Sequence, residues 1–122
     1  MIFGHGIDLT EIERIKKADM KNPHFARKVL TENEWTYFNE LKGKRRFEYL
    51  AGRFSAKEAY SKALGTGIGK FVSLQAVEIL NDASGKPYIN KHPRLGLLKT
   101  HLSISHTDSL VMTSVILEEI NS

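Results

Sequence analysis

Apolar and polar positions follow different periods in the two halves of the chain. Residues 2–9 mix apolar side chains with two glycines and predict a first strand. Thr10 and Thr31 are each followed three residues later by a glutamate, the pattern of a capping box, which predicts a helix start at each position. We therefore expect helices over residues 10–20 and 31–41, with a short helical turn over residues 23–29 between them.

The longest predicted helix covers residues 44–64 and ends where Gly65 supplies a C-terminal cap. Apolar residues occupy two opposite faces of this helix, so we expect it to be enclosed by the fold or by a partner. One apolar stripe, continued at its own spacing, reaches Glu58 and Lys62, where packing surface gives way to charge. The two faces carry Phe47, Leu50, Ala51 and Phe54 on one side and Tyr49, Gly52, Ala56, Ala59, Tyr60 and Ala63 on the other.

Strand-like segments dominate the second half of the chain. Residues 91–98 are expected to form a loop or a single helical turn. Because helices cluster in the first half and strands in the second, the pattern predicts an α+β protein with an antiparallel sheet mainly in its second half. The predicted strands cover residues 74–80, a return through Tyr88 and Ile89 after a turn at 81–87, then residues 101–106 and 110–117.

Composition narrows the classes of protein. A chain of 122 residues, 41% of them hydrophobic, predicts one domain over residues 1–122 with a buried core, which excludes wholesale disorder. The absence of cysteine excludes a disulfide scaffold, a thiolate metal site and a thiol nucleophile. The apolar runs are far shorter than the roughly 20 residues that span a membrane, and no targeting pattern is present, so we expect a cytoplasmic protein. The net charge of +4 permits acidic partners without identifying one.

Asp8, Glu58 and Lys62 are the strongest candidates for chemistry. Asp8 closes the first predicted strand, and Arg53 and Lys57 place further cations near Glu58. On residue types alone, Asp8 also suits a helix N-terminus, and Glu58 with Lys62 suits a surface ion pair. A carboxylate pair among cations favours a site that binds Mg²⁺ and phosphates together, with Asp8 and Glu58 as the metal ligands.

Two further motifs carry weaker signals. The glycine-rich run 65–69 resembles a phosphate-binding loop, but it follows a helix instead of preceding one, which favours a plain helix stop. Ser105 and His106 could form a nucleophilic pair, yet consecutive strand residues point to opposite faces of a sheet, which argues against a hydrolase triad. The hydroxyls and the imidazole at this strand end instead favour nucleotide binding.

Residues 14–28 form a basic segment with six cationic side chains against a single aspartate. Such a run is often only a solvated surface, but apolar residues nearby also suit it to an acidic helical partner. Arg14, Lys17 and Lys21 share one helix face. The remaining cations are Lys16, Arg27 and Lys28, and the nearby apolar residues are Met20, Phe25 and Phe54.

Two rival classes make different demands on the residues. An RNA-binding domain would need aromatic side chains on its strand faces, whereas the predicted strands carry only Phe3, Phe71 and Tyr88. A nucleotide-dependent regulatory domain would not need Glu58 beside a metal. We therefore expect no nucleic-acid partner and no membrane partner, and the response to Mg²⁺ separates the three classes.

Gly6-Ile7-Asp8, followed later by the run RFSAKEAYSKA over residues 53–63, resembles the two-part signature of the 4′-phosphopantetheinyl transferase family. The length of the chain is similar to that of the short, single-domain branch of the family. The resemblance covers nearly the whole chain, because it continues through residues 50–52, 65–69, 85–87 and 103–107.

The resemblance implies transfer of the 4′-phosphopantetheine arm of coenzyme A to a serine of an apo acyl carrier protein, in support of fatty acid biosynthesis. The other product would be adenosine 3′,5′-bisphosphate. By the same resemblance, Asp8 and Glu58 hold Mg²⁺ against the pyrophosphate, and Lys62 contacts the same phosphates. The general base stays open among Glu58, Asp8 acting through water, and a metal-bound hydroxide. The implied coenzyme A contacts are Arg53, Lys57, Lys62, Gly65, Gly85, Lys86, Pro87, Ser105, His106 and Thr107, with His106 near the 3′-phosphate.

The resemblance further implies a homotrimer whose active sites lie between subunits, which would account for a helix that is apolar on two faces. It also makes the basic segment a docking surface for an acidic carrier protein. The implied docking residues are Arg14, Lys17, Lys21, Phe25, Arg27, Lys28, Phe54 and Ile68.

Overall fold

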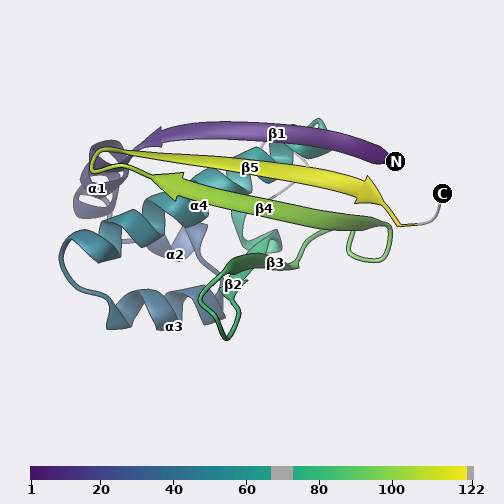
Figure 1. The fold of residues 1–122 in the computed structure, drawn as a ribbon. Coiled ribbons are helices and arrows are strands. Elements are labelled where there is room, and N and C mark those ends of the chain that lie inside the picture. Colours follow the sequence, from purple (N-terminus) through teal and green to yellow (C-terminus); the bar gives the residue numbers. More distant parts are fainter. Residues whose placement is uncertain (67–72, 121–122) are drawn as a thin grey trace.

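The computed structural model describes residues 1–66 and 73–120 and confirms an α+β architecture (Figure 1). A three-stranded sheet has the strand order β1-β5-β4, and a separate hairpin pairs β2 with β3. The elements are β1 (Ile2–Glu11), α1 (Ile12–Lys21), α2 (Phe25–Val29), α3 (Glu32–Glu40), α4 (Lys44–Leu64), a 3-10 turn η1 (Leu74–Ala76), β2 (Glu78–Asn81), β3 (Pro87–Lys91), β4 (Leu98–His106) and β5 (Leu110–Glu119).

The first strand of the chain pairs with the last one. β1 runs antiparallel to β5, with Asp8 opposite Thr113, and so forms one edge of the sheet. The side chains of Asp8 and Thr10 are buried on the face toward α4, whereas Ile7 and Leu9 are 53% and 61% exposed on the other face. The carboxylate of Asp8 therefore points toward α4, and the outer face of β1 is apolar.

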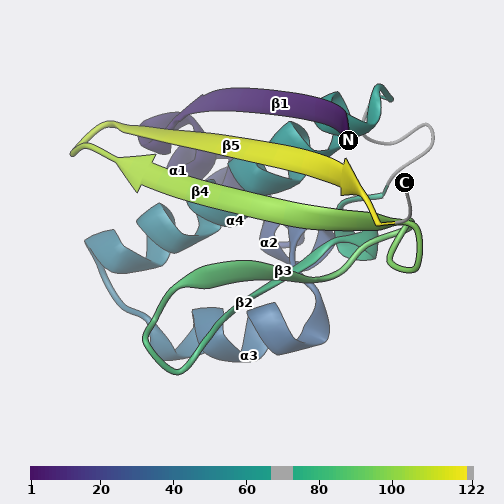
Figure 2. The same cartoon turned by 45° about the vertical axis from the view of Figure 1, so that its right-hand side comes forward.

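Helix α4 lies behind the sheet, with α1, α2 and α3 on its other sides (Figures 1 and 2). Two glycines allow β1 to approach this helix closely. A Cβ atom added at Gly4 would collide with the carbonyl oxygen of Ala63, and one added at Gly6 would collide with that of Ala59. Only residues without a side chain fit between the strand and the helix backbone at these two positions.

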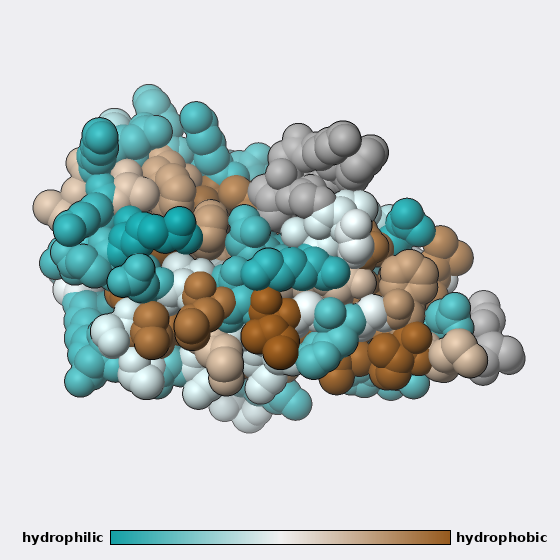
Figure 3. Space-filling model, turned by 90° about the horizontal axis from the view of Figure 1, so that it is seen from above, coloured by the Kyte–Doolittle hydropathy of each residue, from teal (hydrophilic) through white to brown (hydrophobic). Residues whose placement is uncertain are grey.

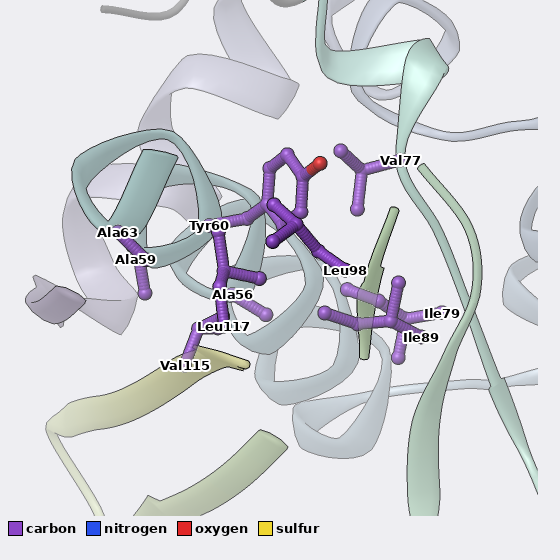
Figure 4. Packing of buried hydrophobic residues seen from close by; sticks show 10 residues of the cluster. All are labelled: Ala56, Ala59, Tyr60, Ala63, Val77, Ile79, Ile89, Leu98, Val115 and Leu117. Atoms are coloured by element: carbon purple, nitrogen blue, oxygen red, sulfur yellow. The ribbon is translucent and has the colours of Figure 1, made fainter. Parts of the chain in front are cut away.

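The core consists of two hydrophobic clusters, one on each side of α4. One cluster joins Ala56, Ala59 and Tyr60 of the helix to β2, β3 and β5 (Figure 4). The other joins Leu50 and Ala51 to α1, α2 and α3. The two apolar faces predicted for this helix are therefore both covered by its own chain, and a partner is not needed to explain them.

Several predicted element boundaries are wrong, among them the start of β4, which is Leu98 and not residue 101, and two predicted caps are confirmed. Helix α1 begins at Ile12, because the Thr10 hydroxyl donates to Asp8 from within β1 and makes no cap. The strand predicted over residues 74–80 is a 3-10 turn followed by β2. The capping box of Thr31 and the left-handed cap at Gly65 are both present.

Over the described part of the chain, helices long and apolar enough to cross a membrane are absent.

Gly6→Ala tests the contact between β1 and α4. Because the new methyl group would meet the helix backbone, we expect a loss of about 1–3 kcal/mol in the free energy of unfolding, measured by urea denaturation. Gly96→Ala is the matched control, since its added Cβ meets no atom within 4 Å, and we expect a change within about 0.5 kcal/mol. Equal stability of both variants would contradict the close approach.

Candidate active site

Asp8 is held in one orientation by a hydrogen-bond network whose Thr10 and Ser55 members are buried. Its Oδ2 atom accepts hydrogen bonds from the Thr10 hydroxyl at 2.6 Å and the Ser55 hydroxyl at 2.7 Å. Its Oδ1 atom accepts from Lys62 Nζ at 3.1 Å, and Lys62 also donates to the carbonyl oxygen of Ile7 at 3.1 Å. The network therefore ties the inward face of β1 to two successive turns of α4.

The second carboxylate of the site, Glu58, differs from Asp8 in its electrostatics. Burial raises the pKa of Glu58, and the nearby negative charge of Asp8 raises it further, against the opposing effects of Lys62 and Arg14. For Asp8, burial alone would raise the pKa, but the hydrogen bonds from Thr10, Ser55 and Lys62 outweigh it and lower the pKa. The folded structure therefore favours the charged form of Asp8 and disfavours the charged form of Glu58 beside it.

This pair of carboxylates fits Mg²⁺. The ion takes oxygen ligands, typically one or two carboxylates, and completes its shell with phosphates and water. A cation between Asp8 and Glu58 would relieve the repulsion that raises the pKa of Glu58. Within residues 1–66 and 73–120, no group of three or more His, Asp and Glu side chains is placed to hold a metal ion.

Lys57 does not contact phosphate, contrary to the prediction for it. Its side chain is fully buried, and Nζ donates to Glu34 Oε1 and to the carbonyl oxygen of Val29, both at 2.6 Å. The other oxygen of Glu34 accepts from the backbone N–H of Ile79 at 2.7 Å. Lys57 and Glu34 therefore form a buried ion pair that joins α4 to α3 and β2, which is a structural role.

Helix α4 also borders a cavity of about 350 Å³, on the side away from Asp8 and Glu58. Cationic side chains line this cavity. Arg53 lies in its wall, 6% exposed, with Nη2 donating to Asn81 Oδ1 at 2.9 Å and the guanidinium stacked on the Tyr49 ring. The Nε atom of Arg53 is buried without a hydrogen-bond partner among the described residues. The lining also includes Tyr37, Leu41, Arg45, Glu48, Gly52, Gly85, Pro87, Ile104 and His106. Such a cavity suits an anionic ligand.

The structure separates the predicted coenzyme A contacts. Gly85, Pro87, Arg53 and His106 share the cavity, whereas Lys62 lies beside Asp8. The other predicted contacts lie outside the cavity lining: Gly65 at the end of α4, Lys86 in the β2–β3 turn, and Ser105 and Thr107 on the β4 side.

Four positioning residues were not predicted. Thr10, Ser55 and Thr113 support Asp8, and the Ser55 and Thr113 hydroxyls lie 2.9 Å apart. Asp82 accepts hydrogen bonds from the backbone N–H groups of Ser84 and Lys86 and so shapes the turn that brings Gly85 to the cavity. The Asp-x-Ser turn is visible in the sequence, but the hydrogen bonds that join Ser55 to Asp8 and Thr113 are not, because they link helix and strand residues that are distant along the chain.

The carboxylate site and the cavity lie at opposite edges of the three-stranded sheet. Asp8 belongs to β1, whereas the cavity residues Ile104 and His106 belong to β4. Two strand spacings separate these edges, about 10 Å, and Gly52 lies about 9 Å from Glu58 along the axis of α4. The carboxylates and the cavity are therefore two separate features of one chain, called the carboxylate half-site and the cavity half-site below.

The predicted docking residues are partly gathered beside Glu58. The guanidinium of Arg14 lies 5.9 Å from the centre of the Phe54 ring, and the rings of Phe25 and Phe54 are 6.1 Å apart. Arg27 instead pairs with Glu32 at 2.9 Å. Lys17, Lys21 and Lys28 are exposed, and Ile68 lies outside the described residues.

Comparison with known proteins defines the class. Residues 4–115 match the model of the 4′-phosphopantetheinyl transferase superfamily. A holo-[acyl-carrier-protein] synthase of Streptococcus uberis is 56% identical over 98% of both chains. A crystal structure of the Bacillus anthracis holo-(acyl-carrier-protein) synthase in complex with CoA (3′,5′-ADP) has a TM-score of 0.89 and 48% identity over 98% of both chains. The Neisseria meningitidis synthase has a TM-score of 0.88 and 36% identity, over 98% of this chain and 100% of that one.

The chain therefore belongs to the 4′-phosphopantetheinyl transferase superfamily. Within that superfamily it is an enzyme of the holo-[acyl-carrier-protein] synthase class.

Glu58→Gln tests whether the charged form of Glu58 destabilises the folded state. Because folding raises the pKa of Glu58, the folded state binds more protons than the unfolded state just above the ordinary glutamate pKa, and stability falls as pH rises through that window. Without Mg²⁺ we expect the variant to be more stable than wild type at pH 7.5, on the order of 0.5 kcal/mol, with a smaller difference at pH 4. Urea denaturation at the two pH values measures this difference.

The same variant separates metal binding from general stability. Mg²⁺ should raise the melting temperature of wild type more than that of Glu58→Gln, because an ion that binds only the folded state stabilises it. Glu40→Gln, on the exposed surface of α3, should behave as wild type in both measurements. A destabilised Glu58→Gln variant with an intact response to Mg²⁺ would contradict this account of the site.

Proposed function

We propose that the enzyme transfers the 4′-phosphopantetheine moiety of coenzyme A to a serine of apo acyl carrier protein, giving holo acyl carrier protein and adenosine 3′,5′-bisphosphate. The observation that carries the proposal is the pairing of Asp8 and Glu58 beside Lys62 on the β1 side, with an anion-binding cavity around Arg53 on the other. The names of the relatives and the coenzyme A complex of the Bacillus anthracis protein support it. We place the reaction in fatty acid biosynthesis in the cytoplasm.

Asp8 and Glu58 would hold Mg²⁺. When bound, the ion would neutralise charge on the pyrophosphate of coenzyme A and stabilise the charge that develops during transfer. Lys62, already oriented by Asp8 and the carbonyl oxygen of Ile7, would add a cation to the same phosphates. The hydrogen bonds from Thr10 and Ser55 would keep the Asp8 carboxylate in place throughout.

The reaction forms one P–O bond and breaks another. The carrier serine oxygen attacks the β-phosphorus, the bond from that phosphorus to the bridging oxygen breaks, and adenosine 3′,5′-bisphosphate leaves with the electron pair. The serine proton needs an acceptor. Glu58, and Asp8 acting through water, are the candidate acceptors among the described residues.

The cavity would receive the 3′-phosphate of coenzyme A. Arg45, Arg53 and His106 supply cationic or donor groups there. Gly85 and Pro87 close the opposite wall from the β2–β3 turn and leave room for the adenosine.

A homotrimer would join the two half-sites. In coenzyme A the 3′-phosphate and the pyrophosphate belong to one nucleotide, so both half-sites must meet around it. A ring in which the β1 edge of one copy faces the β4 edge of the next would bring them together. The exposed apolar residues of the outer face support such an interface: Phe3, Ile7, Leu9 and Met112. Figure 3 shows hydrophobic side chains in a broken row along this side of the molecule.

The carrier protein would dock on the basic face of α1. Lys17 and Lys21 are exposed there, and Arg14 leads from them to the Phe54 ring and to Glu58. A negatively charged helical partner matches this surface in charge and would present its serine toward the carboxylates.

Intact-mass measurement of the carrier tests the reaction. With coenzyme A, Mg²⁺ and apo carrier protein, we expect one phosphopantetheine on each carrier, and we expect none when a chelator removes the metal. Glu58→Gln should lower turnover by about 100-fold or more because it removes a metal ligand, while Glu40→Gln should stay at the wild-type level. A carrier of unchanged mass in the wild-type reaction would refute the assignment.

Charge reversal tests the docking surface. Lys17→Glu with Lys21→Glu should raise the KM for the carrier on the order of tenfold and leave the KM for coenzyme A nearly unchanged, with a smaller effect at high salt. Lys91→Glu, on β3, is the control and should change neither constant. Equal increases for both substrates would contradict docking at this helix.

A further inference from the structure

Glu48 places a carboxylate where the proposed ligand is an anion. It lies on α4 one turn before Gly52 and lines the same cavity as Arg45, Arg53 and His106. Its side chain is only 19% exposed, so it is not a solvated surface group. A negative charge here repels a phosphate, so the presence of Glu48 in this cavity needs an explanation.

The contacts of Glu48 point to His106. Glu48 Oε2 lies 3.9 Å from His106 Nδ1, and the same nitrogen lies 3.1 Å from the carbonyl oxygen of Thr107. A carbonyl oxygen only accepts, so Nδ1 carries a proton. The two contacts occupy the Nδ1 side of the ring and leave Nε2 as the nitrogen available to a ligand, which receives a hydrogen bond from it when the ring carries both protons.

An ordinary helix-surface ion pair does not explain Glu48. Glu48 Oε2 lies 4.0 Å from Lys44 Nζ, about as far as it lies from His106 Nδ1, but Lys44 is held more closely by Asp108 at 2.7 Å. Lysine N-terminal to glutamate is also the less favourable order on a helix. Lys44 and Asp108 have side chains 61% and 96% exposed, whereas the Glu48 side chain is 19% exposed.

We propose that Glu48 is a positioning residue that acts through His106: it holds the imidazole from its Nδ1 side, so that Nε2 binds the 3′-phosphate of coenzyme A. This inference rests on the proposed function. It assigns discrimination between coenzyme A and 3′-dephospho-coenzyme A to a pair of residues, one on α4 and one at the end of β4.

Calorimetric binding of the two ligands to Glu48→Gln tests the proposal. We expect the Kd for coenzyme A to rise about tenfold, while the Kd for 3′-dephospho-coenzyme A stays at the wild-type value. In the transfer reaction the KM for coenzyme A should rise and kcat at saturation should not change. In a His106→Ala background the same substitution should have no further effect on coenzyme A binding, because the two residues act as a unit.

Each other outcome overturns the proposal. If Glu48 only adds negative charge to the cavity, Glu48→Gln will bind coenzyme A more tightly than wild type does. If Glu48 only supports the fold, both ligands will weaken together. An additive effect in the His106→Ala background would also refute the pairing. Glu40→Gln is the control and should leave both Kd values unchanged. A wild-type enzyme that binds neither ligand and transfers nothing would refute the proposed function itself, which is a distinct result.

Discussion

The close contact between β1 and α4 determines where the side chains of the carboxylate site lie. Gly4 and Gly6 let the strand rest on the carbonyl oxygens of the helix, and two residues further along β1 the carboxylate of Asp8 meets Ser55 and Lys62. A larger side chain in the strand would push the two elements apart and break hydrogen bonds of about 3 Å or less. The chemistry therefore depends on a packing constraint that lies outside the site itself.

Lys57 and Glu58 are adjacent in one helical motif but have different roles. Lys57 turns into the core and pairs with Glu34, whereas Glu58 turns toward Asp8. Successive helical residues are rotated by about 100°, so a motif of consecutive charged residues must divide between faces. The buried pair binds α3 and β2 to α4. Its removal would leave an uncompensated buried charge, which makes Lys57 essential to the fold without any contact to substrate.

The sequence was sufficient to predict what depends on local pattern and on motif. It predicted the long helix over residues 44–64 and the Thr31 capping box. The pairing of Asp8 with Glu58 around a metal ion stays a prediction. The sequence did not predict that Lys57 is buried, because an ion pair between distant helices leaves no periodic signal. The prediction that Thr10 caps a helix is wrong, because the Thr10 hydroxyl donates a hydrogen bond to Asp8 instead. The separation of the half-sites follows from β1 joining β5 at the sheet edge, a long-range pairing that composition and spacing do not encode.

The central proposal is that each chain carries two half-sites that a neighbouring copy joins. Mixing two inactive variants tests it most directly: Glu58→Gln disables the carboxylate half-site, and His106→Glu disables the cavity half-site by repelling phosphate. If sites form between subunits, a trimer assembled at random from equal amounts of both variants has about a quarter of its sites with two intact halves. Co-refolded variants should then regain about 25% of wild-type transfer activity. A mixture that stays as inactive as either variant alone would contradict the account.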